Sequence, residues 1–272
     1  MDNFGLLLHE WRAEVEKEAE ATRRAPLLLS AATYFAVDFF INKVYRSYPV
    51  GSVSENLDWI NAMCYDYRGS WDPSATGAQA TLYDPKSNVS TSYGLRSWIK
   101  ANFLRKKLIM GLPLYGRLVP KGEGTRKGSM AGLKAFTRCI FAILSLTNSC
   151  VMASSRSQAV TGAYWPSWAF DTLPPSAIKT SLFTHIYYAF FIPNNVTYKF
   201  DITNLTASML ANFTSTFHSS NPPLKTLFSI GGANNGLELF SRMSSNSSSR
   251  KVFIDSTIEV ARKFGFDGID LD

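Results

Sequence analysis

The sequence predicts an α/β fold, an incomplete (β/α)8 barrel of parallel strands surrounded by helices. Seven apolar segments of strand length are spaced along the 272 residues, and helix-like stretches separate them. Continuous apolar runs are typical of strands buried on both faces, as in a parallel sheet covered by helices. An apolar content of 46% and a charged content of 18% indicate a globular chain with a sizeable core. Seven such strands fit a barrel better than a small open sheet.

The expected elements begin with a helix. Residues 2–24 carry apolar side chains at helical spacing, and Asp2 is the expected N-cap. The expected strands cover residues 27–35, 59–67, 107–114, 160–165, 183–190, 224–230 and 266–272. Helix-like runs occupy residues 93–102, 207–217 and 251–264. This alternation is the element order of a (β/α) barrel.

Residues 129–156 differ from both flanking parts and divide the chain into units 1–128 and 157–272. Met130 begins a short basic stretch, an apolar run follows at 139–146, and small residues come next. This order is typical of a secretory signal peptide, and the apolar run is too short to span a membrane. We therefore expect an internal signal-peptide-like linker and no membrane span. An ordinary buried helix within a linker is the alternative.

Charge, cysteines and glycosylation motifs narrow the function classes. The net charge of +7 is spread along the chain and not gathered in one basic patch, which disfavours nucleic-acid binding. The three cysteines have no spacing typical of zinc or a redox pair, and we expect neither a metal nor a cofactor. Five Asn-x-Ser/Thr sequons favour a secreted glycoprotein, whereas the first residues lack a signal pattern. The sequon asparagines are Asn88, Asn195, Asn204, Asn212 and Asn246.

The last expected strand, 266–272, carries carboxylates on one face. Asp270 and Asp272 are two residues apart, so their side chains point the same way. A row of like charges raises the pKa of its members and is costly unless the carboxylates are paired or used. The carboxyl ends of barrel strands are where catalytic groups lie. Taken alone, Asp-x-x-Asp-x-Asp also fits a cation site in a loop or ordinary surface acids.

The same strand resembles the catalytic signature of family 18 glycoside hydrolases, the chitinase family. Phe266-Asp267-Gly268-Ile269-Asp270-Leu271-Asp272 is similar to Asp-x-x-Asp-x-Asp-x-Glu. Other segments resemble that family's strands: 162–168, 183–190 and 227–233 the first three, and 27–35, 63–67 and 110–117 the fifth to seventh. The likeness is strongest to plant class V chitinases and covers nearly the whole chain apart from 118–156.

The resemblance implies a TIM-type barrel whose halves stand in swapped order. Residues 1–128 resemble the C-terminal half of the family barrel, and residues 157–272 resemble its N-terminal half. We find no match to the family's eighth strand, to the tryptophan it carries, or to its small α+β insertion. A fusion of two tandem copies, with Met130 as the initiator of the second, would explain the internal signal-like segment. A circular permutation is the alternative.

The resemblance also implies the site residues of a retaining mechanism in which the substrate's own N-acetyl oxygen attacks the anomeric carbon. Asp272 would orient the acetamido group, Asp270 would share a proton or hydrogen bond with it, and Tyr65 would donate its hydroxyl to the acetamido oxygen. The expected substrate-binding residues are Tyr164, Phe190, Ser229, Gly231, Gly232, Met63, Asp66, Tyr115 and Arg117.

The final glutamate of the signature, the family's general acid, has no counterpart in the sequence, and loss of such a proton donor costs about 10²–10⁴-fold in rate. We therefore expect a chitinase-like protein that acts on or binds β-1,4-linked N-acetylglucosamine polymers and is catalytically impaired. A lectin-like chitin-oligosaccharide binder is one alternative. A fused gene-model fragment with two open strand edges is the other. The family implies an extracellular location, and the sequence does not predict the oligomeric state.

Overall fold

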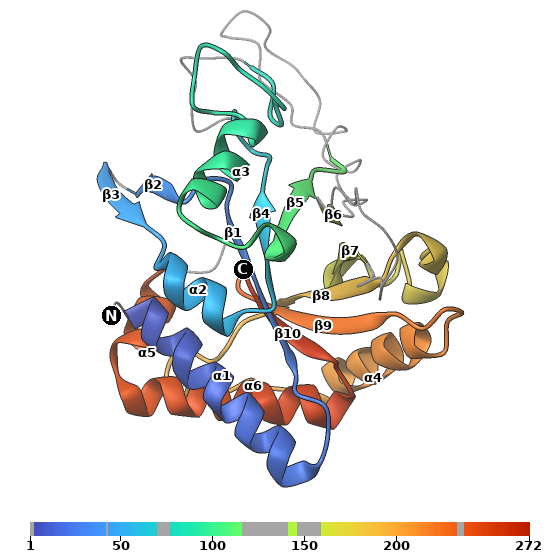
Figure 1. Ribbon diagram of the computed structural model, residues 1–272. Coiled ribbons are helices and arrows are strands. Elements are labelled where there is room, and N and C mark those ends of the chain that lie inside the picture. The colour runs from blue at the N-terminus through green and yellow to red at the C-terminus, as the bar shows by residue number, and fades with distance from the viewer. Residues whose placement is uncertain (1–2, 42, 70–76, 116–140, 146–158, 233–236) are drawn as a thin grey trace, which may run out of the picture.

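The computed structural model describes residues 3–41, 43–69, 77–115, 141–145, 159–232 and 237–272. Within them, seven parallel strands curl into the expected family-like barrel (Figure 1). These strands are β1 (Leu28–Tyr34), β4 (Trp59–Met63), β5 (Leu108–Leu112), β7 (Thr161–Pro166), β8 (His185–Phe191), β9 (Lys225–Ile230) and β10 (Gly268–Leu271). Each falls within or next to a predicted apolar segment, so the predicted strand set is confirmed. A short antiparallel hairpin, β2 (Asp38–Ile41) with β3 (Val44–Ser47), follows β1.

The neighbour order of the strands is the one that swapped halves require. Around the barrel the order is β1-β10-β9-β8-β7-β6-β5-β4, and β4 pairs with β1 again. The first strand of the chain therefore pairs in parallel with the last, Ser30 opposite Asp270. Strands that resemble the family's fourth and fifth lie side by side, although they are more than 200 residues apart in the sequence.

The place of the family's eighth strand is taken by β6 (Phe141–Ser145). It pairs antiparallel with both β5 and β7, so the parallel barrel remains incomplete but the sheet closes. The expectation of two open strand edges is therefore wrong, because an apolar five-residue run offers backbone groups to both edges. Residues 116–140 and 146–158 lie outside the described residues, and the signal-like interpretation of the linker remains a prediction.

Helices cover the outside of the sheet. They are α1 (Asn3–Thr22), α2 (Val50–Asn56), α3 (Thr91–Lys100), α4 (Asn204–His218), α5 (Leu237–Ser245) and α6 (Ser247–Phe264). Short 3₁₀ turns cover Arg105–Lys107, Ser167–Ala169, Pro175–Ala177 and Thr180–Leu182. The predicted N-cap Asp2 lies outside the described residues. Among the described helices, none is long and apolar enough to cross a membrane.

Local sequence sets the ends of α6. The Asn246 side chain accepts hydrogen bonds from the backbone N–H groups of Ser248 and Ser249, which satisfies two donors of the first turn. Gly265 ends the helix in the left-handed conformation, at φ 74°, where a residue without Cβ has no steric penalty. Two residues separate Gly265 from β10, so the end of α6 places the start of the carboxylate strand.

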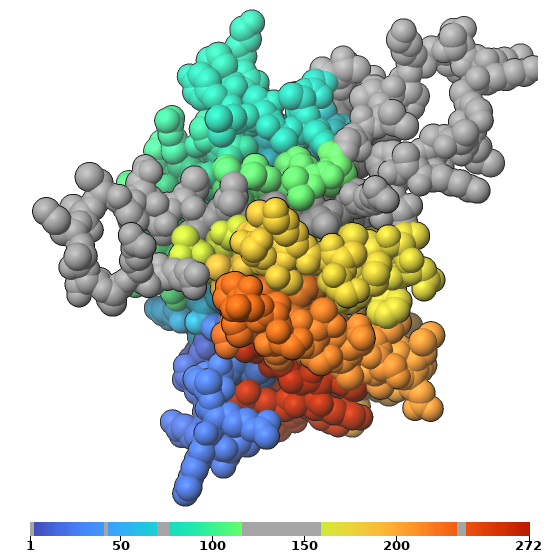
Figure 2. All heavy atoms as spheres, turned by 90° about the vertical axis from the view of Figure 1, so that its right-hand side faces the viewer, coloured from blue at the N-terminus to red at the C-terminus, as the bar shows by residue number. Residues whose placement is uncertain are grey.

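The first and last helices join the two parts of the chain. Helix α1, near the blue end of the chain, lies against α6, near its red end (Figures 1 and 2). Trp11 of α1 packs edge-on against Phe253 of α6, with ring centroids 5.2 Å apart. Arg250 of α6 forms a two-pronged ion pair with Glu10 of α1. Glu18 of α1 pairs in the same way with Arg262 of α6. Burial of Trp11 contributes more than these partly exposed ion pairs.

We expect Trp11→Ala to lower the free energy of unfolding by about 3–5 kcal/mol, because it removes a buried aromatic side chain and leaves a cavity. Urea unfolding followed by circular dichroism measures the change. The control is Trp168→Ala, which removes a largely exposed ring and should change the same quantity by less than about 0.5 kcal/mol. Loss of helix from one half of the chain alone, in a separate first transition, would contradict the joint packing of α1 and α6.

Candidate active site

Three polar side chains meet at one level of three neighbouring strands. The register places Ser30 of β1 opposite Asp270 of β10, and Asp270 opposite Ser229 of β9. The two serine hydroxyls donate to the two oxygens of the Asp270 carboxylate, at 2.6 Å from Ser30 and 2.7 Å from Ser229. All three residues are buried, so the carboxylate is held inside the barrel by its own sheet.

Two further donors reach Asp270 from other strands. The Tyr164 hydroxyl of β7 donates to Oδ2 at 2.8 Å, and the Asn61 amide of β4 lies 3.4 Å from Oδ1 and 3.0 Å from the Tyr164 hydroxyl. Desolvation raises the pKa of Asp270, and the hydroxyl donors oppose that rise without cancelling it. A buried carboxylate surrounded by donors can change protonation without losing all its partners.

Tyr164 is fixed by an aromatic stack. Its ring lies 4.5 Å from the Tyr187 ring at an interplanar angle of 15°, and the Trp59 indole N–H donates to the Tyr187 hydroxyl at 3.0 Å. Burial and the nearby Asp270 charge raise the pKa of Tyr164 well above its ordinary value. The phenol therefore stays protonated and acts as a donor to the carboxylate.

Asp272 directly follows β10 at the mouth of the barrel. It comes two residues after Asp270, so the two side chains point to the same face of the strand. The Asp272 backbone N–H donates to the Ile230 carbonyl at 2.8 Å, and its backbone passes so close to Gly231 that a Cβ there would collide with the Asp272 carbonyl oxygen. Gly231 has φ 114°, which favours glycine for a second reason. Desolvation, and secondly the charge of Asp270, raise the pKa of Asp272 to about 7.

Tyr65 faces this carboxylate from the end of β4. Burial, and then the Asp272 charge, raise its pKa well above the ordinary value, so its hydroxyl remains a donor. The Tyr65 ring packs edge-on against the Tyr115 ring, with centroids 6.1 Å apart. Gly111 has no Cβ and so leaves room for the Tyr65 ring. Asp66, the next residue, has a left-handed backbone with φ 58°, and its charge adds to the rise in the Tyr65 pKa.

Other predicted site residues line the same mouth or lie near it. Phe190 is half-buried at 6.2 Å from the Tyr164 ring, and a Cβ on Gly232 would press against the Phe190 ring. Met63 is half-buried at the end of β4, opposite Tyr34 of β1. Arg117 lies outside the described residues.

Asp267, the first carboxylate of the motif, lies at the opposite end of the barrel. It precedes β10 and accepts hydrogen bonds from the Lys225 ammonium at 2.7 Å and the Thr226 backbone N–H at 2.9 Å. These partners lower its pKa despite partial burial. Asp267 therefore anchors the start of the strand, and Asp270 and Asp272 are the carboxylates at the site.

Sequence reasoning missed two partners of Asp270. Ser30 stands inside a predicted apolar strand, and Asn61 is a polar residue in an otherwise apolar run. A buried polar side chain within a central strand is itself a signal, because it requires a partner. The partner could not be named without the strand register. The Asn61 side-chain oxygen has no hydrogen-bond partner among the described residues.

The arrangement combines two carboxyl groups of different accessibility with tyrosine donors. Asp270 is enclosed, whereas Asp272 at the mouth can meet a ligand near neutral pH in either protonation state. In the described part of the chain, no group of three or more His, Cys, Asp or Glu side chains could hold a metal ion. Cys64 is buried, and desolvation raises its thiol pKa to about 12, which makes it a poor nucleophile.

A family model described as "Glycosyl hydrolases family 18" matches residues 1–154 and 160–272. This chain belongs to that family. Nod factor hydrolase protein 1 of Medicago truncatula is 50% identical over 117 residues, which are 43% of this chain and 30% of the relative. Class V chitinase CHIT5 of Lotus japonicus is 48% identical over 118 residues, 43% of this chain and 30% of the relative. The chain thus spans less than one third of the length of either relative.

A solved structure of the class V chitinase from Nicotiana tobaccum shows a similar match. It is 42% identical, with 40% of this chain and 32% of that chain covered and a TM-score of 0.37. The family 18 and class V chitinase resemblance of the sequence is confirmed by the family model and the curated relatives.

The raised pKa of Asp272 predicts a pH-dependent stability. Between the ordinary value of 3.8 and the folded value of about 7, the folded state binds more protons than the unfolded state, so stability falls as pH rises through this range. Asp272→Asn removes this loss. We expect the variant to be more stable than the unaltered protein above pH 7, and the difference to shrink toward pH 3.8.

Thermal unfolding of both proteins across this pH range measures the difference. Asp270 is present in both, so its own titration largely cancels. The control is Val196→Ala, which changes an exposed side chain without a titratable group, so its difference from the unaltered protein should not change with pH. A stability gain of Asp272→Asn that grows toward acid pH would contradict the burial of this carboxyl group.

Proposed function

We propose that the barrel mouth recognises β-1,4-linked N-acetylglucosamine oligosaccharides, as expected of a chitinase-like member of family 18. One observation carries the proposal. Asp270 is enclosed and surrounded by hydrogen-bond donors, whereas Asp272 lies at the mouth near Tyr65 and has a pKa of about 7. The names of the curated relatives, which include several class V chitinases, support this ligand class.

In this proposal Asp272 orients the acetamido group of the sugar. When protonated, its carboxyl donates to an acetamido acceptor, and when ionised it accepts from the acetamido N–H. Tyr65 keeps its proton and donates to the acetamido oxygen. Asp270 accepts its hydrogen bonds deeper in the barrel, and its charge contributes to the raised pKa of Asp272. The half-buried Phe190 presents ring surface to the sugar, whereas the buried Tyr164 contributes to the sugar site through its hydrogen bond to Asp270.

Hydrolysis would require the general acid of the signature, whose position would be residue 274. Among the described glutamates none lies at the barrel mouth: Glu55 belongs to α2, and Glu238 is an exposed residue of α5. We therefore limit the proposal to oligosaccharide binding by the described residues. The activity of the family as a whole rests on the carboxyl group at that position.

We expect the 272-residue protein to bind tetra-N-acetylchitotetraose in a calorimetric titration and to bind cellotetraose, which lacks acetamido groups, much more weakly. Tyr65→Phe should weaken binding about 2- to 13-fold, because it removes one hydrogen bond to the ligand. Tyr45→Phe, on the exposed β2–β3 hairpin, is the matched control and should leave affinity unchanged. Equal affinity for both sugars, or no binding by folded protein, would refute acetamido recognition. Measurable turnover of a chromogenic chitin oligomer by these residues alone would contradict the need for that general acid.

We propose further that the protein enters the secretory route. All five sequon asparagines are exposed, so each could carry a glycan without unfolding the barrel. When the chain is expressed in a eukaryotic secretory host, we expect part of it in the medium, with a mobility that increases after treatment with an N-glycosidase. Retention of all protein inside the cell, without a mobility change, would contradict the proposal.

A further inference from the structure

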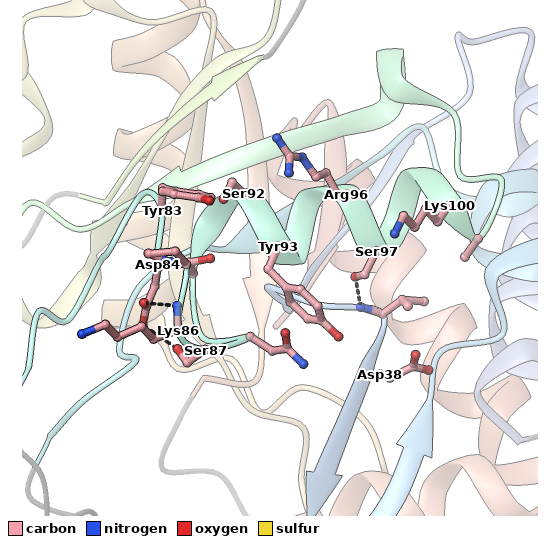
Figure 3. A pocket seen from close by; sticks show the side chains of 15 residues that line it. Asp38, Tyr83, Asp84, Lys86, Ser87, Ser92, Tyr93, Arg96, Ser97 and Lys100 are labelled. Carbon is pink, nitrogen blue, oxygen red and sulfur yellow. Dashed lines mark hydrogen bonds between the residues drawn. The ribbon is translucent and has the colours of Figure 1, made fainter.

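A polar pocket lies outside the barrel, away from Asp270 and Asp272. It has a volume of about 670 Å³ and lies between α3, the loop that precedes it and the start of β2 (Figure 3). The Ser97 hydroxyl of α3 accepts from the Val37 backbone N–H at 3.0 Å, which fixes one wall against the segment after β1. The pocket is therefore built on hydrogen-bonded structure and not on a loose surface.

Three cationic side chains line this pocket. Arg96 and Lys100 are four residues apart on α3 and so share one face of the helix, whereas Lys86 lies at the rim on the opposite loop (Figure 3). In the described part of the chain, no ion pair or side-chain hydrogen bond involves any of the three. All three are exposed, so their charges are available to a ligand.

The acidic side chains of the pocket are already engaged. The Asp84 carboxylate accepts from the Lys86 backbone N–H at 2.8 Å and from the Ser87 hydroxyl at 2.6 Å. Asp38 accepts from the Tyr45 hydroxyl at 2.7 Å. Ser97 also donates to the Gly94 carbonyl. Both carboxylates keep their charge, so the pocket carries three positive and two negative side chains and a surplus of one positive charge.

Two tyrosine rings add flat surface to the opposite walls. Tyr83 on the loop is 63% exposed and Tyr93 on α3 is 41% exposed. The negatively polarised face of an exposed aromatic ring can contact the C–H groups of a ligand. Tyr93 and Arg96 are three residues apart on α3, and both line the pocket, although their side chains point in different directions (Figure 3).

We propose that this pocket binds an acidic oligosaccharide. The donor-rich cationic groups select a ligand with many acceptors and negative charge, such as sugar carboxylates or sulfates. The rings select a ligand with sugar-like faces over a simple anion. A neutral N-acetylglucosamine oligomer lacks the charge, so this ligand class differs from that of the barrel mouth. The inference does not depend on the proposed function.

The test is a calorimetric titration of the 272-residue protein with trigalacturonate at low salt, using protein made without N-glycans because the sequon residue Asn88 also lines the pocket. We expect saturable binding that weakens as salt is raised, because exposed charges are screened. The double variant Arg96→Ala/Lys100→Ala should bind at least about tenfold more weakly, since it removes two charged donors. Tyr93→Ala, which leaves the charge unchanged, should weaken binding about 2- to 13-fold through loss of ring contact.

The matched control is Arg105→Ala/Lys106→Ala, which removes the same number of charges at exposed positions outside the pocket. It should change affinity by less than about twofold. Equal losses in the two double variants would show attraction by net charge alone and overturn the proposal. So would an unchanged affinity in Tyr93→Ala, equal binding of the methyl-esterified trimer, equal binding of inorganic phosphate, or no binding by protein whose circular dichroism shows it folded.

Discussion

The enclosed carboxylate of Asp270 is the group on which the rest of the barrel depends. A buried charge without hydrogen-bond partners costs several kcal/mol. Here four side-chain donors surround it, and they come from both parts of the chain: Ser30 and Asn61 from the first, Tyr164 and Ser229 from the second. Neither part alone can satisfy this carboxylate, so the network joins the strands it belongs to.

The outer helices also join the two parts of the chain, through an aromatic contact and two ion pairs. The ring of Trp11 packs on Phe253, and two arginines of α6 reach glutamates of α1 more than 200 residues away. The strands between them follow the neighbour order of a family 18 barrel, with β6 in the eighth place. The inner network and the outer helix pair therefore close the structure at the same side of the barrel, where the first and last strands meet.

Much of the fold could be predicted from the sequence because buried parallel strands are recognisable as apolar runs. The run at 139–146 was assigned to a signal-like segment, since composition does not distinguish an apolar h-region from an apolar strand. Asp270 and Ser229 were predicted through the family resemblance. Ser30 and Asn61 were not, because their role depends on which strands become neighbours. The pocket beside α3 shows the same limit: the helical spacing of Arg96 and Lys100 is visible in the sequence, but the facing loop is not.

The parallel pairing of β1 with β10 also bears on how this architecture can be rearranged. Each strand in a closed sheet has two neighbours, and those neighbour relations are set by contacts across the sheet and not by chain order. Such a ring has no privileged starting point. Moving the break in the covalent chain from one loop to another leaves the interior carboxylate with the same donors, which explains how halves in exchanged order can still build one interior.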